Sequence, residues 1–140
     1  VYIHGYETEF QYKLNELIDL EGSFSATRGE NLTDNSPLYY VPPDKILLST
    51  EVYLSPFSIN LMHKKVFSQN RVGLYEETTP GYETYNLIGT YTIRSAQAVH
   101  KFILQIDNVF DRKYYNHLSR IKSIMPEKGR NIGFQYRLNF

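Results

Sequence analysis

Apolar and polar residues alternate over several long stretches of the chain. In Gly129 to Phe140 (GRNIGFQYRLNF), every second side chain from Ile132 onward is apolar. The same period of two recurs in Tyr2 to Leu14 and in the stretch IDLEGSFSATRG. This period is typical of β-strands with one apolar and one polar face, and no segment keeps the helical period of 3.6 for more than a turn or two. The pattern therefore predicts an all-β fold.

About seven strands are predicted, and the connections between them alternate in length. The other four strands are DKILLSTEVYL, SINLMHKKVFSQ, ETYNLIGTYTI and KFILQIDNVF. The second of these is the least regular, because His63 and Lys65 share the face of Ile59, Leu61 and Phe67. Short turns alternate with three long irregular segments, GENLTDNSPLYYVPP, NRVGLYEETTPGY and DRKYYNHLSRIKSIMPEK. An antiparallel up-and-down meander would then place all short turns at one end of the sheet and all long loops at the other.

The alternation by itself leaves open what covers the apolar face, since a soluble β-rich domain and a membrane barrel both produce it. The chain has no run of about 18 apolar residues, which excludes a helical membrane protein. Its mean hydropathy of −0.43 is compatible with a barrel, because polar lumen-facing residues lower the average. Its 13 Tyr and 8 Phe suit membrane interfaces. The sorted loops favour a transmembrane β-barrel, with the C-terminus on the short-turn, periplasmic side.

Other function classes receive little support from the composition. The 15 basic and 15 acidic residues balance, so no net field favours nucleic acid, and the absence of cysteine removes thiolate chemistry. Asp107 or Asp111 could be drawn with His117 as an acid/base pair, but no Gly-x-Ser-x-Gly element, phosphate-binding loop or carboxylate cluster accompanies them. The four histidines lack paired ligand spacing. We expect neither enzymatic activity nor a bound cofactor.

The stretch DNVFDRKYYNHLSRIKSIMPEKGRNIGFQYRLNF resembles the C-terminal end of a TonB-dependent outer-membrane receptor. In that family the penultimate strand ends in an Asn-hydrophobic-Phe-Asp run followed by Lys-Tyr-Tyr, and the last strand begins with Gly-Arg and closes on an aromatic residue. The matching positions here are Asn108, Val109, Phe110, Asp111, Lys113, Tyr114, Tyr115, Gly129, Arg130 and Phe140, with Pro126 displaced upstream. PGYETYNLIGTY resembles the preceding strand, so the likeness covers about the last 60 residues.

The resemblance implies that residues 1–140 form the C-terminal portion of a plugged barrel of about 22 strands in the bacterial outer membrane. It implies TonB-coupled uptake of a scarce nutrient, such as a metal ion, metal chelate, haem or cobalamin. The plug domain and TonB box have no match in this chain, and Val1 opens directly into a strand pattern, so we expect a longer protein. The alternatives are a passive porin-type barrel and a soluble β-rich binding or adhesion domain.

Four kinds of partner follow from this interpretation. They are outer-membrane lipid, the TonB complex through the missing N-terminal part, the barrel-assembly machinery, and a small nutrient or metal ligand. In an isolated fragment, the unpaired edges of the first and last strands would also favour self-association. Tyr136, Leu138 and Phe140 resemble the signal by which outer-membrane proteins are recognised for barrel insertion, although a plain lipid-facing strand has the same pattern.

Candidate ligand-binding residues lie in the three long segments. They are Tyr39, Tyr40, Glu76, Glu77, Tyr114, Tyr115 and His117. The tyrosines could form an aromatic rim around a ligand or belong to an interfacial girdle. NHLSRIK with PEKGR resembles a loop of receptors associated with zinc uptake, which implies a metal role for His117 with Glu76 or Glu77; iron chelates, haem, cobalamin and copper stay open. The charges on the polar strand faces are expected to line the lumen: Glu7, Glu9, Lys13, Glu21, Glu51, Lys101, Asp107 and Arg137.

Overall fold

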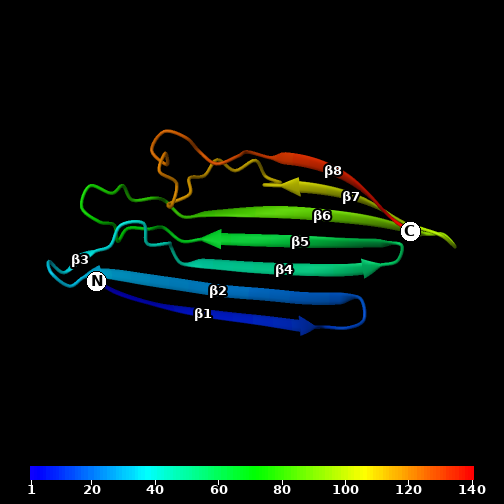
Figure 1. Cartoon of the computed structure of the whole chain (residues 1–140), viewed down its shortest axis with the longest axis horizontal. Helices are drawn as coiled ribbons and strands as arrows, with labels where there is room; N and C mark the ends of the chain where they lie inside the picture. The colour runs from blue at the N-terminus through cyan, green and yellow to red at the C-terminus, as the bar shows by residue number, and fades with distance from the viewer.

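The computed structural model describes all 140 residues as one antiparallel β-sheet (Figure 1). Its strands are β1 (Tyr2–Lys13), β2 (Ile18–Asn31), β3 (Ser36–Pro37), β4 (Lys45–Leu54), β5 (Phe57–Val66), β6 (Tyr82–Arg94), β7 (Val99–Asp107) and β8 (Asn131–Asn139). The order across the sheet is β1-β2-β4-β5-β6-β7-β8, and the short β3 pairs with β2. The structure contains no helix long and apolar enough to cross a membrane. The predicted all-β meander of seven long strands is confirmed.

The connections are sorted by length between the two ends of the sheet. Residues 14–17, 55–56 and 95–98 form short turns at one end, and residues 32–44, 67–81 and 108–130 form long loops at the other (Figure 1). This sorting follows from the consecutive antiparallel order, because each strand reverses the direction of the one before it. The predicted separation of turns from loops is therefore confirmed.

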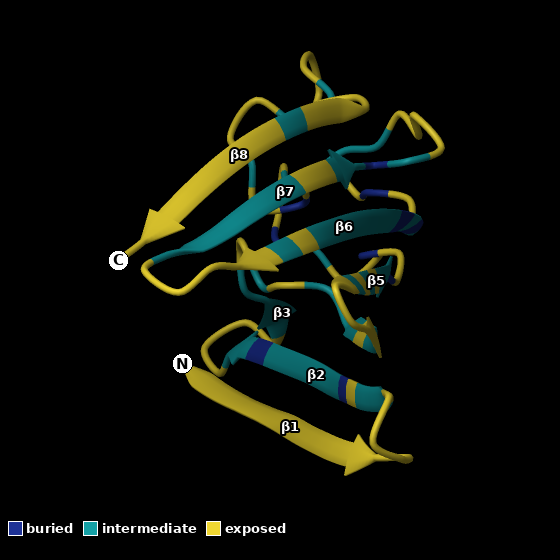
Figure 2. Cartoon of the chain, turned by 90° about the vertical axis from the view of Figure 1, so that its right-hand side faces the viewer, coloured by how far each residue is buried: buried dark blue, intermediate teal, exposed yellow.

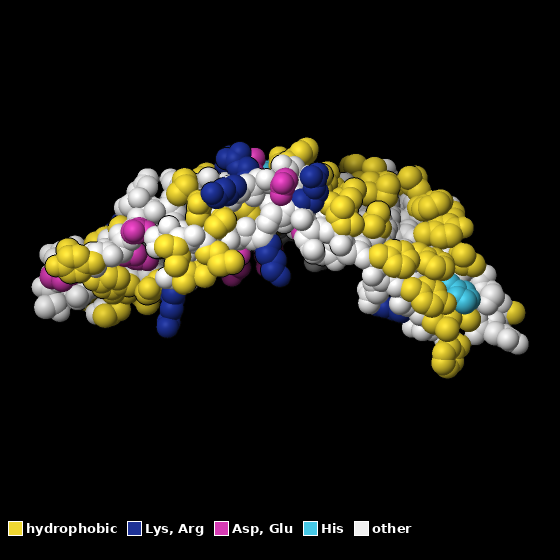
Figure 3. All heavy atoms as spheres, turned by 90° about the horizontal axis from the view of Figure 1, so that it is seen from above, with side chains coloured by type: hydrophobic (Ala, Val, Ile, Leu, Met, Phe, Trp, Pro, Cys, Tyr) yellow, Lys and Arg dark blue, Asp and Glu magenta, His cyan; other side chains and the backbone are white.

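The register places most apolar residues of the seven long strands on one face of the sheet, although Leu47, Ile88 and Ile103 lie on the other. Directly paired residues point to the same side, and Leu61 pairs with Leu87, Leu87 with Ile106, and Ile106 with Ile132. The sheet is arched, and many hydrophobic side chains lie on its convex side (Figure 3). His63 and Lys65 share this face with Leu61, as the irregular pattern of this strand predicted. The predicted lumen-facing charges all lie on the opposite, polar face.

The sheet has almost no core of its own. Val66 and Tyr82 are its only buried hydrophobic residues, and β1 is exposed along its whole length. The strands follow a curved wall with β1 and β8 at its two ends, and both are largely exposed (Figure 2). A sheet normally buries its apolar face against a second layer, and this chain supplies none. The apolar face therefore requires a cover from outside the chain, either lipid or another protein surface.

A row of aromatic side chains crosses the apolar face near the short turns. The ring centroids of Phe57 and Tyr91 lie 4.7 Å apart, those of Tyr91 and Phe102 6.4 Å, and those of Phe102 and Tyr136 5.1 Å. The Tyr136 hydroxyl lies 2.8 Å from Nδ1 of His100. The row spans four neighbouring strands at one height. Aromatic girdles of this kind mark the interfaces of membrane barrels.

Candidate functional site

The three long loops meet in a buried polar cluster at the loop end of the sheet. Its side chains are Glu76 and Thr79 from loop 67–81 and His117 and Lys122 from loop 108–130, and loop 32–44 adds the backbone of Tyr40. We call this group the loop clasp. The sheet order sets its position, because consecutive antiparallel strands bring all three long loops to the same end of the sheet. Its members are separated by up to 82 residues, from Tyr40 to Lys122.

Glu76 is the centre of the loop clasp, with a side chain only 5% exposed. Its carboxylate accepts hydrogen bonds from the backbone N–H of Gly73 at 3.2 Å and from that of Tyr40 at 3.3 Å. Nζ of Lys122 donates to Oε1 of Glu76 at 3.2 Å. One carboxylate thus takes donors from all three loops, so these contacts restrain the loops relative to one another.

His117 packs against Glu76 with a side chain only 1% exposed. Its Nδ1 lies 2.9 Å from Oγ1 of Thr79 and 3.2 Å from Nζ of Lys122. An ammonium group can only donate, so Nδ1 accepts and the ring proton belongs on Nε2. Nε2 lies 3.1 Å from Oε1 of Glu76, but the two atoms do not adopt hydrogen-bond geometry. The contact is therefore electrostatic rather than a formed hydrogen bond.

The surroundings shift the pKa values of both groups. For His117, burial and then the positive charge of Lys122 lower the pKa, and together they outweigh the opposing effect of Glu76. For Glu76, burial is the largest effect and would raise the pKa, but the donors from Gly73, Lys122 and Tyr40 together lower it. The cluster therefore holds a neutral imidazole beside an ionised carboxylate at neutral pH.

The loop clasp brings together two of the residues predicted for a metal site, His117 and Glu76. The structure contains no group of three His, Cys, Asp or Glu side chains that could hold a metal ion. Lys122 contacts both Glu76 and His117, so its ammonium group already supplies a positive charge beside the carboxylate. The exposed Glu77 is not among the contacts of the cluster. The geometry thus favours a loop-anchoring role for His117 and Glu76 and gives the predicted metal role no support.

The four candidate tyrosines belong to two separate groups. A Cβ added to Gly73 would meet the ring of Tyr39 at 2.7 Å, so this ring lies directly against loop 67–81. Nζ of Lys122 lies 6.0 Å from the ring centroid of Tyr40, whose φ is 55°. The ring of Tyr114 packs on Tyr82 at 4.3 Å, on the polar face. No ring of the first loop pairs with a ring of the third, so a single continuous rim is not formed.

Tyr114 and Tyr115 both belong to loop 108–130. Nζ of Lys113 lies 5.9 Å from the ring centroid of Tyr115. Because Tyr114 packs on the polar face, it lies away from the aromatic row of the apolar face, and the girdle interpretation is wrong for this residue. The aromatic row of the apolar face is formed instead by strand residues. Sequence reasoning placed Tyr91, Phe102 and Tyr136 on the apolar faces of their strands, but it left Phe57 outside the strand SINLMHKKVFSQ.

A polar pocket of about 280 Å³ lies on the polar face beside Tyr114. Its charged side chains are Lys64, Asp107, Glu127 and Lys128, and none of them forms an ion pair with another residue. Sequence reasoning named only Asp107 and Tyr114 among these residues. Lys64 could have been found from its position on the polar face of β5. Glu127 and Lys128 could not, because an irregular loop folds back to bring them there.

The Asn-hydrophobic-Phe-Asp run forms a compact turn at the end of β7. Asn108 has a φ of 50°, and its side chain accepts from the backbone N–H of Arg112 and donates to the Arg112 carbonyl, both at 2.9 Å. Asp111 accepts from the backbone N–H of Arg130 at 2.7 Å. A Cβ at Gly129 would lie 2.7 Å from Oδ1 of Asp111. The motif residues therefore contact one another directly. A side chain at position 129 would collide with the Asp111 carboxylate, which explains why glycine precedes Arg130.

The proposed assembly residues lie along β8 and at its end. Tyr136 and Leu138 point to the apolar face, where they pair with Phe102 and His100, and Phe140 is fully exposed after the strand ends. β8 pairs only with β7, so its other edge is open within this chain. These positions agree equally with an assembly signal and with a lipid-facing strand.

The shape of the sheet and the sorting of its loops define a class of fold. A curved, open antiparallel meander with an apolar convex face and sorted loops has the architecture of a wall segment of a β-barrel. No family model matches the chain. Among solved structures, its fold is similar to that of the copper transporter OprC, with a TM-score of 0.85 and 22% identity over 96% of this chain. The chain spans 22% of the length of that protein, and the likeness at this identity concerns the fold.

Proposed function

We propose that the chain forms part of the wall of an outer-membrane transporter that takes up a scarce nutrient with energy supplied through TonB. The observation that carries this proposal is the apolar convex face, which runs across seven strands without any cover from the chain itself. Lipid is a suitable cover for such a face, and the aromatic row near the short turns matches a membrane interface. The open edges of β1 and β8 would pair with further strands of a closed barrel.

Transport is supported by the fold shared with the copper transporter OprC. The substrate class we propose is a metal ion or a metal chelate, haem or cobalamin. TonB coupling is supported only by the resemblance of the C-terminal motif, whose residues contact one another around Asp111 and Gly129. The polar pocket beside Tyr114, with its unpaired charges, is the proposed site of ligand contact on the lumen side.

The proposed orientation places the three long loops outside the cell and the short turns in the periplasm. The C-terminus would then be periplasmic, because β8 runs from the loop end to the turn end. Tyr136, Leu138 and Phe140 would be recognised by the barrel-assembly machinery during insertion. These assignments follow the usual arrangement of long external loops and short periplasmic turns in outer-membrane barrels.

The test uses the full protein that contains this chain, in cells of its source. Uptake of labelled copper, zinc and iron chelates is measured in the unmodified strain, in a strain lacking the protein and in a strain lacking TonB. The proposal expects uptake of one substrate to be lost in both deletion strains. Uptake that needs the protein but not TonB would identify a passive porin-type barrel. A protein recovered in buffer fractions without detergent would contradict the membrane location itself.

A further inference from the structure

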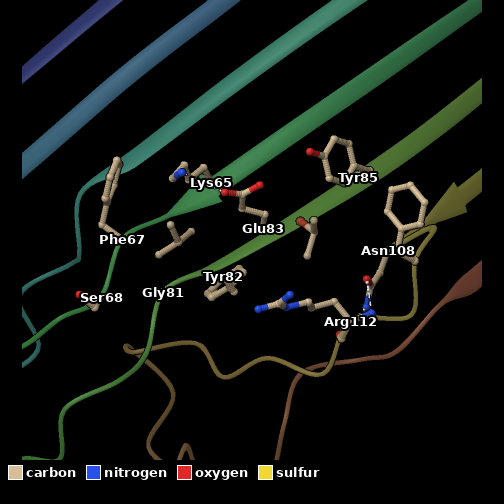
Figure 4. Close-up of a pocket in the computed structure, with 12 residues that line it drawn as sticks. Lys65, Phe67, Ser68, Gly81, Tyr82, Glu83, Tyr85, Asn108 and Arg112 are labelled. Carbon is tan, nitrogen blue, oxygen red and sulfur yellow. Dashed lines mark hydrogen bonds and ion pairs between the residues drawn. The ribbon is translucent and has the colours of Figure 1, made fainter.

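A second pocket, of about 590 Å³, lies beside the loop end of β6 (Figure 4). β7 pairs with β6 only from Leu87 onward, so residues 82–85 have no strand partner on that side. The segment after β7 runs beside them instead, and the backbone N–H of Val109 donates to the Tyr85 carbonyl at 2.8 Å. The pocket occupies the gap that this change of partner creates.

Aromatic side chains on the convex face form much of the pocket wall. Tyr85 faces this side because it pairs with His63, and the two rings stack at 4.5 Å. The ring of Phe110 meets Tyr85 edge-on at 5.2 Å, and Nζ of Lys65 lies 5.6 Å from the ring centroid of Phe67. These rings lie at the loop end of the same face that carries Leu87. The pocket is therefore continuous with the apolar face.

The charged side chains of the pocket are not equivalent. Glu83 contacts Nζ of Lys65 at 2.9 Å and Nε2 of His63 at 3.3 Å, so its charge is already matched within the sheet. Arg112 also lines the pocket, and its guanidinium group has neither an ion pair nor a hydrogen bond to the protein (Figure 4). Counting Lys65 and Arg112 against Glu83 leaves one positive charge in excess. The pocket thus combines aromatic walls with an unpaired cation.

The backbone holds Arg112 in place before any ligand arrives. The Asn108 side chain bonds both the N–H and the C=O of Arg112 at 2.9 Å, and the N–H of Asn108 donates to Oδ1 of Asn86 at 2.9 Å. Arg112 is thus tied to β6 through two asparagines. A guanidinium group whose backbone is already fixed loses less freedom when it binds an anion, and its planar donors match phosphate oxygens.

We propose that this pocket binds the phosphate headgroup of an anionic membrane lipid, with Arg112 as the main contact. The acyl chains would extend toward the short turns over the apolar face, past Leu87 and Leu61. The position supports a lipid rather than a free phosphate, because the convex face contributes Lys65, Glu83 and Tyr85 to the pocket lining, at the border between apolar strands and polar loops. Anionic headgroups attract cations at this depth. The inference depends on the proposed membrane location.

The test compares the purified full protein with its Arg112→Gln variant after reconstitution into vesicles. Vesicles contain phosphatidylcholine alone or with one fifth phosphatidylglycerol, and lipids retained by the protein after mild detergent extraction are counted by native mass spectrometry. Arg137→Gln is the matched control, because it removes one positive charge from the polar face of β8. Inorganic phosphate is added in a parallel series as a competitor.

The unmodified protein and Arg137→Gln are expected to retain phosphatidylglycerol in preference to phosphatidylcholine. Arg112→Gln should reduce this preference roughly fivefold, the effect of one cation near a membrane surface. Raising the salt concentration should weaken retention by the unmodified protein, a readout that requires no substitution. Equal retention of both lipids by all three proteins would overturn the inference. Full displacement by inorganic phosphate would overturn the choice of a lipid. Failure of the unmodified protein to insert would instead count against the proposed function.

Discussion

Replacing Glu76 with Gln tests whether the loop clasp holds the three long loops together. The substitution keeps the shape of the side chain but removes the charge, and its amide NH₂ adds donors where Gly73, Tyr40 and Lys122 already donate. Lys122 would lose its only ion-pair partner while its side chain stays 9% exposed. We expect local destabilisation of the loops, with the strands unchanged.

The magnitude follows from the burial of the pair. Removing one partner of a buried ion pair typically destabilises by about 3 to 5 kcal/mol. Because the loops can relax and admit water, we expect the lower end, about 3 kcal/mol, which is roughly a hundredfold in a local opening equilibrium. The change should be confined to loops 32–44, 67–81 and 108–130, since the hydrogen bonds of the sheet do not involve Glu76.

Hydrogen exchange of the full protein in its membrane environment measures this directly. The backbone amides of Tyr40 and Gly73, together with those of residues 117–122, should exchange roughly a hundredfold faster in Glu76→Gln. Glu77→Gln is the control, because it removes the same charge from an exposed neighbour. Unchanged exchange in the loops would refute the role of the clasp, and so would an equal response to Glu77→Gln.

Three further predictions concern the clasp, the apolar face and the C-terminal turn. Because the pKa of His117 is lowered in the closed loop, the opened loop takes up a proton at a higher pH than the closed loop does. The free energy of loop opening should therefore stay constant above pH 6.5 and fall below that pH by at most about 1.4 kcal/mol per pH unit. Hydrogen exchange at pH 7.5 and pH 5.5 measures this difference. His117→Asn should remove the pH dependence. Leu87→Arg places a charge on the apolar face near mid-strand, so it should lower the free energy of unfolding, measured by urea unfolding from vesicles, by about 2 to 4 kcal/mol. Thr90→Arg, on the polar face, is the control and should have little effect. Gly129→Ala should break the bond from Arg130 to Asp111 and destabilise by about 1 to 2 kcal/mol. Gly133→Ala, with open space around the added methyl group, is its control, and equal melting temperatures for the two variants would refute the steric argument.

The alternation of side chains determined the strands and their faces. Leu61, Leu87, Ile106 and Ile132 were assigned to apolar faces from a period of two, and the register joins them across four strands. The pleat of a strand sends successive side chains to opposite sides whatever the strand later pairs with, so this information is local. The sorting of short turns from long loops was equally accessible, because it follows from strand order alone.

The loops carry no such period, so their contacts could not be predicted in detail. His117 and Glu76 were paired as a metal site, but only the folded loops bring Lys122 into contact with both and make the cluster an anchor. The position of Arg112 depends on Asn108 and on the point where β7 stops pairing with β6. Contacts of this kind join residues distant in the chain, and their geometry depends on the register of the whole sheet. The sequence alone thus determined which residues face the apolar side, whereas the tertiary structure decided which loop residues meet.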